Sequence, residues 1–308
     1  MNYPVTFQPE IKDALANGKA VVALESTIIS HGLPFPENLQ TARAIEQMVR
    51  DHGAIPATIA ILDGDIKIGL SDTDLAKLAS PDSDVTKVSR RDIASVIARK
   101  GHGATTVAST MIFAEMAGIA VFATGGIGGV HKGAETDFDI SADLPELSQT
   151  NVAVVSAGPK AILDLALTME YLETHGVPVI GYGTDELPAF WSRASGLMLT
   201  DRADNADEVA SRMSIKWALG LSGGMLIANP VPKASEIKAE TLTTVIAEVL
   251  DEARQKGIIG KEATPFLLDR IRQKTDGRTL ITNQALVMNN AKVAAQIACA
   301  YAAISASS

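Results

Sequence analysis

The stretch "NVAVVSAGPKAILDLALTMEYLETHGVPVIGYG", residues 151–183, decides the fold of this chain. It begins with an apolar run typical of a buried strand (151–158) and continues with a helical pattern (161–176) that ends in a glycine. A second apolar strand follows at 177–183. Strands that alternate with helices in this way predict a mostly parallel sheet that is covered by helices on both faces.

The same alternation occurs in the rest of the chain. Residues 20–27, "AVVALEST", form an apolar strand, residues 37–53 form a helix, and residues 57–71 predict a hairpin that turns at Asp63 and Gly64. We expect further strands at 119–126 and 223–232 and further helices at 89–101, 106–118, 211–221, 240–257, 264–277 and 281–304. No linker or repeat marks a boundary, so residues 1–308 are predicted to form one interwoven domain of the α/β class, with three α/β/α layers.

Composition restricts the class of protein. The 308 residues are 46% hydrophobic and carry a net charge of -9, which disfavours a broad surface for nucleic acid. No segment resembles a signal peptide or a membrane span, and the single cysteine, Cys299, suits a reducing compartment. We therefore expect a cytoplasmic protein with a small-molecule partner and with neither nucleic acid nor membrane as a partner.

A glycine-rich segment, "ATGGIGGVHKGAE", follows the strand at 119–126. Its glycines let the backbone approach an anion or turn with positive φ. The spacing fits neither a P-loop nor a dinucleotide fingerprint, so a purely structural turn is the alternative. Asp137 and Asp139 follow closely, and in an extended segment they would share one face and suit a hard divalent cation. A solvated loop explains these two carboxylates equally well.

Glu25 and Lys160 are candidates for catalysis. Glu25 lies at the carboxyl end of an apolar strand, where ligands bind in parallel sheets, and burial there would suit a general acid. It could instead only accept backbone hydrogen bonds. Lys160 follows a Gly-Pro turn at the predicted start of a helix, where the helix dipole disfavours the ammonium and favours a Schiff-base nucleophile. The alternative is a lysine that extends its ammonium to solvent.

Lys87 lies just before Arg90 and Arg91 in "KVSRRD". Three cations so close together could hold a phosphate, although the start of a helix explains the two arginines equally well. His31 is interpreted as a residue that forms hydrogen bonds within its loop.

Eight motifs together resemble one family: "ALESTIISHGLPFPEN", "KVSRRD", "GATTVASTM", "FATGGIGGVHKGAE", "FDISADL", "AGPKAILDL", "TMEYLETHGVPVIGY" and "NQALVMNNA". They are similar, in the same order, to the pseudouridine-5′-phosphate glycosidases, which are related to indigoidine synthase A proteins. The resemblance spans residues 8–303. It implies an α/β/α fold, a homotrimer and a divalent metal, usually Mn²⁺. It also implies reversible cleavage of pseudouridine 5′-phosphate by water into uracil and ribose 5-phosphate.

The resemblance also implies a role for each matching residue. Glu25 corresponds to the proton donor, Lys160 to the covalent nucleophile and Asp139 to the metal ligand. Asn283 corresponds to an asparagine that contacts the uracil. Pro159 departs from the small residue expected there, but proline is tolerated in a first helical turn. The remaining substrate contacts correspond to Lys87, Val107, Ser141, Ala142 and Asp143.

Two functions of other classes stay open on the residues alone. An aldolase-type lyase on another sugar phosphate would use Lys160 and a phosphate site but would not need Asn283 for a base. A nucleotide-binding protein without catalysis would keep the glycine loop and would have no use for a reactive lysine.

Overall fold

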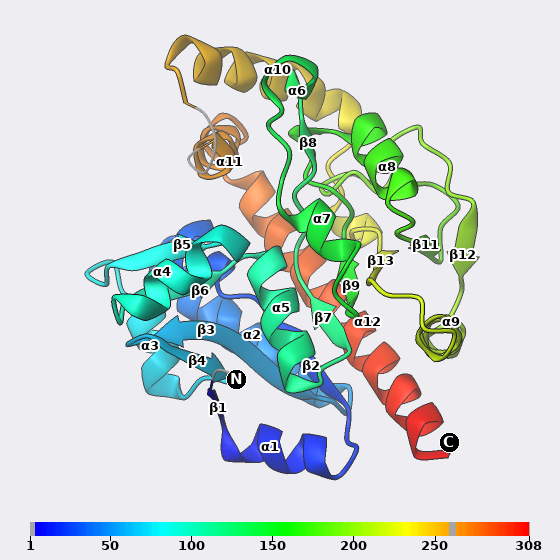
Figure 1. Cartoon of the computed structure of the whole chain (residues 1–308). Helices are drawn as coiled ribbons and strands as arrows, with labels where there is room; N and C mark the ends of the chain where they lie inside the picture. The colour runs from blue at the N-terminus through cyan, green and yellow to red at the C-terminus, as the bar shows by residue number, and fades with distance from the viewer. Residues whose placement is uncertain (1–3, 259–262, 308) are drawn as a thin grey trace.

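A computed structural model describes residues 4–258 and 263–307 of the chain (Figure 1). The centre of the molecule is one sheet with the strand order β1-β4-β3-β2-β7-β9-β13-β11-β12, to which β6 and β5 are added beside β3. The strands are β1 Val5–Phe7, β2 Val21–Leu24, β3 Ile55–Leu62, β4 Asp65–Ile68, β5 Val85–Val88, β6 His102–Thr105, β7 Val121–Ala123, β9 Ala153–Ser156, β11 Val179–Tyr182, β12 Asp201–Ala203 and β13 Met225–Ala228. Every pair from β3 through β2 to β12 is parallel, which confirms the predicted mostly parallel sheet.

Strand β2 shows why the sheet is covered on both sides. Its side chains alternate, so Val22 and Leu24 pack into one hydrophobic core while Val21 and Ala23 pack into the other. The first core is closed by α2 Glu37–Asp51, α9 Ala206–Ala218, α10 Ala239–Gln255, α11 Ala263–Lys274 and α12 Arg278–Ser307. The second is closed by α1 Pro9–Ala16, α5 Val107–Ala117, α7 Asp143–Leu147 and α8 Leu165–Thr174. The three layers and the single domain are as predicted.

The antiparallel part of the sheet lies around β3. The hairpin of β3 and β4 turns at Asp63 and Gly64, both with positive φ, which confirms the predicted turn. Strand β6 also pairs antiparallel with β3 and carries β5 beside it. Neither β5 nor β6 was predicted: both are only four residues long, and in β6, "HGAT", a single residue, Thr105, is of a type enriched in strands.

Short elements complete the chain. They are α3 Asp72–Ala79, α4 Ile93–Ala98, α6 Ala134–Asp137, a two-stranded pair of β8 Val130–His131 with β10 Leu163–Asp164, and the single turns η1 Ile28–Gly32, η2 Arg90–Asp92 and η3 Lys233–Ser235. Among the described residues, no helix is both long enough and apolar enough to span a bilayer.

Helix α12 crosses the molecule from α11 to the end of the chain (Figure 1). Asn290, fully buried within it, ties the helix to the carboxyl edge of the sheet. Its Nδ2 donates to the carbonyl oxygens of Thr124 (2.8 Å) and Gly125 (3.3 Å), and its Oδ1 accepts from Asn229 Nδ2 at 2.8 Å. These bonds hold the start of the glycine-rich segment in place.

Replacing Asn290 by leucine, Asn290→Leu, is expected to lower the free energy of unfolding by about 2 to 4 kcal/mol, because buried polar groups on both sides lose their partners. Asn289→Leu is the matched control. The neighbouring amide is only half-buried and makes a single 3.2 Å bond to the Pro230 carbonyl, so its loss should cost about 1 kcal/mol or less. Urea denaturation of both variants measures the difference, and equal losses would contradict the role given to Asn290.

Candidate active site

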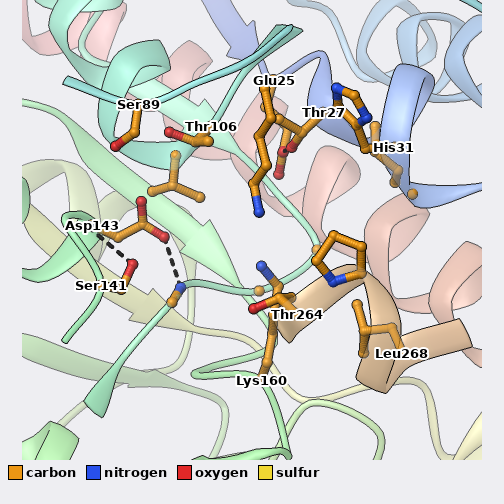
Figure 2. Close-up of a pocket in the computed structure, with 18 of the residues that line it drawn as sticks. Glu25, Thr27, His31, Ser89, Thr106, Ser141, Asp143, Lys160, Thr264 and Leu268 are labelled. Carbon is orange, nitrogen blue, oxygen red and sulfur yellow. Dashed lines mark hydrogen bonds between the residues drawn. The ribbon is translucent and has the colours of Figure 1, made fainter. Parts of the chain in front are cut away.

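A pocket of about 500 Å³ opens at the carboxyl ends of β2, β7 and β9. All nine residues that the sequence analysis selected line it, and they come from segments spread over most of the chain: Glu25, Lys87, Val107, Asp139, Ser141, Ala142, Asp143, Lys160 and Asn283. Figure 2 shows Lys160 extending into the same space that Glu25 faces. The structure therefore places the predicted acid and the predicted nucleophile in one cavity.

The glycine loop, residues 125–129, is held against the lysine turn, residues 157–160. The Ala157 N–H donates to the Gly125 carbonyl (3.0 Å), the Ile127 N–H donates to the Gly158 carbonyl (3.2 Å), and the Lys160 N–H donates back to the Ile127 carbonyl (3.1 Å). These bonds continue the parallel pairing of β7 with β9 beyond the strand ends. Backbone pairing therefore fixes the position of the Lys160 Cα in the pocket.

The expectation that Lys160 begins a helix is wrong. Helix α8 starts at Leu165, and the short strand β10 lies between the lysine turn and the helix. The helix-dipole argument therefore does not apply to Lys160, and Pro159 occupies the turn and makes an isolated bridge to Ile127. Gly158 adopts φ +81°, and a side chain there would meet the Pro188 carbonyl, so the turn requires glycine.

Three of the four loop glycines, Gly126, Gly128 and Gly129, are needed for close packing. None has a positive φ, but a Cβ on Gly126 would lie 2.7 Å from the Phe190 ring, and one on Gly128 would lie 2.8 Å from Asp143 Oδ2. The loop thus passes directly beneath a ring and a carboxylate that both line the pocket. The positive φ offered as one reason for these glycines is therefore wrong, and the close contacts that they allow are with groups of the protein itself.

Asp143 joins two walls of the pocket. The carboxylate is buried; its Oδ1 accepts from the Ala108 N–H in the first turn of α5 (3.0 Å) and its Oδ2 accepts from the Gly128 N–H (2.8 Å). Asp143 also donates its own N–H to Ser141 Oγ (3.2 Å). Its oxygens are therefore engaged in holding the glycine loop to α5, beside the predicted contacts Val107 and Ser141.

Glu25 receives hydrogen bonds on both carboxylate oxygens. Thr27 Oγ1 donates to Oε2, and Thr124 Oγ1, from the segment just after β7, donates to Oε1. Two hydroxyl groups thus orient the carboxylate toward the cavity that it lines. Because a hydroxyl both donates and accepts, the same contacts can serve the protonated acid.

The carboxylates after the glycine loop are arranged differently from the expectation. Asp137 ends α6 and is exposed, and the next residue, Phe138, adopts φ +58°. The Asp139 N–H donates to Asp137 Oδ1 (2.9 Å). The segment is therefore a turn, and the side chains of Asp137 and Asp139 do not share one face. Asp139 faces the pocket, with Oδ2 4.0 Å from His131 Nδ1. Burial lowers the pKa of His131, and nearby Lys160 and Lys87 lower it further against the opposing effect of Asp139.

Among the described residues, no group of three or more His, Cys, Asp or Glu side chains is placed to hold a metal ion. Asp139 has a half-buried side chain that borders open cavity. One carboxylate of this kind fits a divalent cation that keeps most of its waters or binds a substrate phosphate as well. The residues present therefore fit a largely hydrated ion on Asp139 and no fully coordinated site.

The pocket has two ends of different character. The polar end contains Lys87, Ser89, Thr106 and Ser141, beside the first turn of α5. The apolar end is formed by Phe190, Leu268, Leu286 and Pro265, with Asn283 as its amide. Figure 2 shows Ser89, Thr106, Ser141 and Asp143 on one side and Thr264 and Leu268 on the other. This division suits an elongated ligand with an anionic group at one end and a flat apolar group at the other.

Sequence reasoning missed several lining residues. Ser89 lies inside the quoted motif "KVSRRD" and could have been selected with Lys87, whereas Phe190 and Leu268 look like ordinary core residues and carry no sequence signal. His31, interpreted as a residue bonded within its loop, is exposed on the rim of the pocket. The cations Arg90 and Arg91 also line it, but Arg90 is committed to the fully buried Glu146 through bonds of 2.6 and 2.8 Å.

Comparison with known proteins gives consistent matches over the whole chain. A pseudouridine-5′-phosphate glycosidase of Geobacillus kaustophilus is 59% identical over 298 residues, which cover 97% of this chain and 99% of the relative. One of Escherichia coli is 56% identical over 293 residues, covering 95% and 94%.

Solved structures match as well. The crystal structure of a prealnumycin C-glycosynthase in complex with ribulose 5-phosphate superposes with a TM-score of 0.92 at 38% identity and full coverage of both chains. An indigoidine synthase A-like protein of Thermotoga maritima gives 0.87 at 36% identity, with 97% of each chain covered. The model of the family "Indigoidine synthase A like protein" matches residues 10–300. The chain therefore belongs to this family, and within it to the pseudouridine-5′-phosphate glycosidases.

Proposed function

We propose that this protein is a pseudouridine-5′-phosphate glycosidase, which cleaves the C–C glycosidic bond of pseudouridine 5′-phosphate to uracil and ribose 5-phosphate. Relatives with that name at 56–59% identity, and a C-glycosynthase of the same fold, support chemistry at a C-glycosidic bond. The observation that carries the proposal is the pocket, where Glu25 and Lys160 face one cavity between a polar and an apolar end.

The two ends match the two parts of the substrate. The phosphate would bind at the polar end, near Lys87, Ser89 and the N-terminal turn of α5, where the lysine ammonium and the helix dipole favour an anion. The uracil would lie at the apolar end against Phe190, with Asn283 as its polar contact. The ribose then spans the middle of the pocket, between Glu25 and Lys160.

The reaction needs a nucleophile because the base leaves through carbon. Glu25 protonates the ribose ring oxygen, the C1′–O bond breaks, and the uracil ring supplies electrons that keep C1′ electrophilic. The Lys160 amine adds to C1′ and loses a proton. The C1′–C5 bond then breaks as C5 of the base takes up a proton, which releases uracil and leaves an iminium. Water hydrolyses the iminium to ribose 5-phosphate and the free lysine, and in reverse the same steps would join the two products.

The proposal includes three properties that rest on the family resemblance: a divalent cation, preferably Mn²⁺, a homotrimer, and a cytoplasmic role in pseudouridine catabolism. Asp139 would hold the cation. A bound cation supplies positive charge beside the sugar phosphate. His131, whose lowered pKa favours the neutral imidazole, leaves this part of the pocket free of a further positive charge.

We expect Lys160→Ala to abolish release of uracil from pseudouridine 5′-phosphate, because without the Lys160 amine the iminium cannot form and the reaction has no other route. Borohydride added during turnover should attach a reduced ribose 5-phosphate to the peptide that contains Lys160, as seen by mass spectrometry. Lys132→Ala is the control, since this exposed lysine lies outside the pocket. The variant should turn over the substrate and form the borohydride-trapped adduct as the wild type does. Wild-type protein that releases no uracil would refute the function; normal turnover by Lys160→Ala would refute only the nucleophile.

Glu25→Gln is expected to slow uracil release by about 10² to 10⁴, because the amide keeps its contacts with Thr27 and Thr124 but has no acidic proton to give. Ring opening precedes attack by Lys160, so little borohydride-trapped adduct should form. Glu135→Gln, an exposed carboxyl on α6, is the matched control. Accumulation of the adduct at the wild-type rate in Glu25→Gln would move Glu25 to the hydrolysis of the iminium.

Chelator is expected to abolish activity and Mn²⁺ to restore it. In Asp139→Asn the affinity for Mn²⁺, followed by the spin-resonance signal of the free ion, should fall by at least tenfold. Asp137→Asn is the control, because its side chain is exposed and its amide oxygen still accepts the Asp139 N–H. Full activity in chelator, or equal Mn²⁺ affinity in the two variants, would refute the role of Asp139.

A further inference from the structure

The apolar end of the pocket contains one amide, and that amide is held by a buried indole. Trp191 Nε1 donates to Asn283 Oδ1 at 2.6 Å, and Trp191 itself is fully buried. Asn283 is half-buried and lines the cavity. The contact therefore joins a core residue to a residue of the pocket wall.

An indole N–H donates and never accepts, so it bonds only to the oxygen of the amide. The Asn283 Nδ2 makes no hydrogen bond to another described residue. Every buried side-chain N or O atom of the described residues has a partner, so an Nδ2 without one is exposed, and it is exposed to the cavity that Asn283 lines. Asn283 thus presents a donor to a ligand. The neighbouring α12 amides each use their nitrogen to bond to protein: Gln284 to Thr41 Oγ1, Asn289 to the Pro230 carbonyl and Asn290 to the Thr124 carbonyl.

The indole is fixed in turn. Its ring packs against Phe190 with centroids 5.1 Å apart, and the Trp191 carbonyl accepts the Ile237 N–H at 2.9 Å. Both aromatic rings belong to the core that α12 closes. Trp191 therefore cannot turn away, and an Asn283 amide flipped by 180° would place its NH₂ against the indole N–H, which costs both groups a partner.

We propose that Trp191 is a positioning residue that fixes Asn283 as a hydrogen-bond donor, so that this end of the pocket selects a base with a carbonyl oxygen and rejects one with an amino group at the same place. The inference rests on the proposed function, since it takes the apolar end to bind the base. A donor facing an amino group leaves both unpaired in a site with little water, and mismatches of this kind are the strongest means of discrimination in binding sites.

The test compares inhibition of pseudouridine 5′-phosphate cleavage by three free bases: uracil, cytosine, in which an amino group replaces the C4 carbonyl, and isocytosine, in which it replaces the C2 carbonyl. Wild-type protein should prefer uracil to the base whose amino group takes the place of the carbonyl that faces Asn283. In Trp191→Phe the amide is free to flip, and the preference for uracil over one of the two amino bases should fall by about tenfold. That base identifies which carbonyl faces Asn283.

Trp217→Phe is the matched control. This indole also donates a hydrogen bond, to the Gly223 carbonyl at 3.1 Å, but lies outside the pocket, so its loss should leave both preferences unchanged. The inference would be overturned if Trp191→Phe prefers uracil over each of the two amino bases to within twofold of the wild-type preference. Wild-type protein that releases no uracil would instead refute the proposed function.

A second measurement serves if Trp191→Phe fails to fold. The chain has only two tryptophans, so its indole N–H region in a nitrogen-15 NMR spectrum holds two signals. Asn283→Leu removes the acceptor of one of them; that signal should move upfield and exchange faster with water, while the Trp217 signal stays in place. Two unchanged indole signals would show that Trp191 does not hold Asn283.

Discussion

Pairing of backbone beyond the ends of β7 and β9 is the constraint on which the pocket depends. Gly125 and Ile127 form hydrogen bonds with Ala157, Gly158 and Lys160 as if the two parallel strands continued, yet both segments are loops. A ladder of backbone hydrogen bonds thus extends from the sheet into the site as far as Lys160. The absence of side chains on Gly126 and Gly128 lets Phe190 and Asp143 lie directly on this ladder, so the walls of the pocket are built on its surface.

The charges of the site differ from those of the molecule. The chain carries a net charge of -9, but Lys87, Lys160 and the first turn of α5 bring positive charge into one cavity. Two of the nearby carboxylates have their oxygens engaged by the protein: Asp143 holds two backbone N–H groups, and Glu146 is paired with Arg90. Their charge is therefore compensated locally, and the pocket can attract a sugar phosphate within an acidic protein.

Sequence patterns predicted the features that depend on local chemistry. The strand at 20–27 and the turn at Asp63 and Gly64 follow from apolar runs and turn residues, and the nine site residues follow from motifs that resemble a family. The predictions that failed concern features that depend on contacts between distant segments. The helix after Lys160 begins four residues later than its apolar pattern suggests, because Leu163 and Asp164 pair as a strand with Val130 and His131. Likewise, Phe190 and Trp191 look like core residues in sequence, and only the fold shows that they form and orient one end of the pocket.

Helix α12 has a consequence for the order of events during protein synthesis. Asn290 lies 166 residues after Thr124, and Gln284 lies 243 residues after Thr41, so these bonds join the start of the glycine loop and helix α2 to the last described element. A ribosome makes α12 after all the strands. Until that helix emerges, the part of the core that α12 covers is exposed, and the start of the glycine loop lacks the hydrogen bonds of Asn290. The polypeptide therefore completes this hydrophobic core and anchors its glycine loop in the same late step, and a chain that stalls before α12 is expected to expose apolar surface and to aggregate.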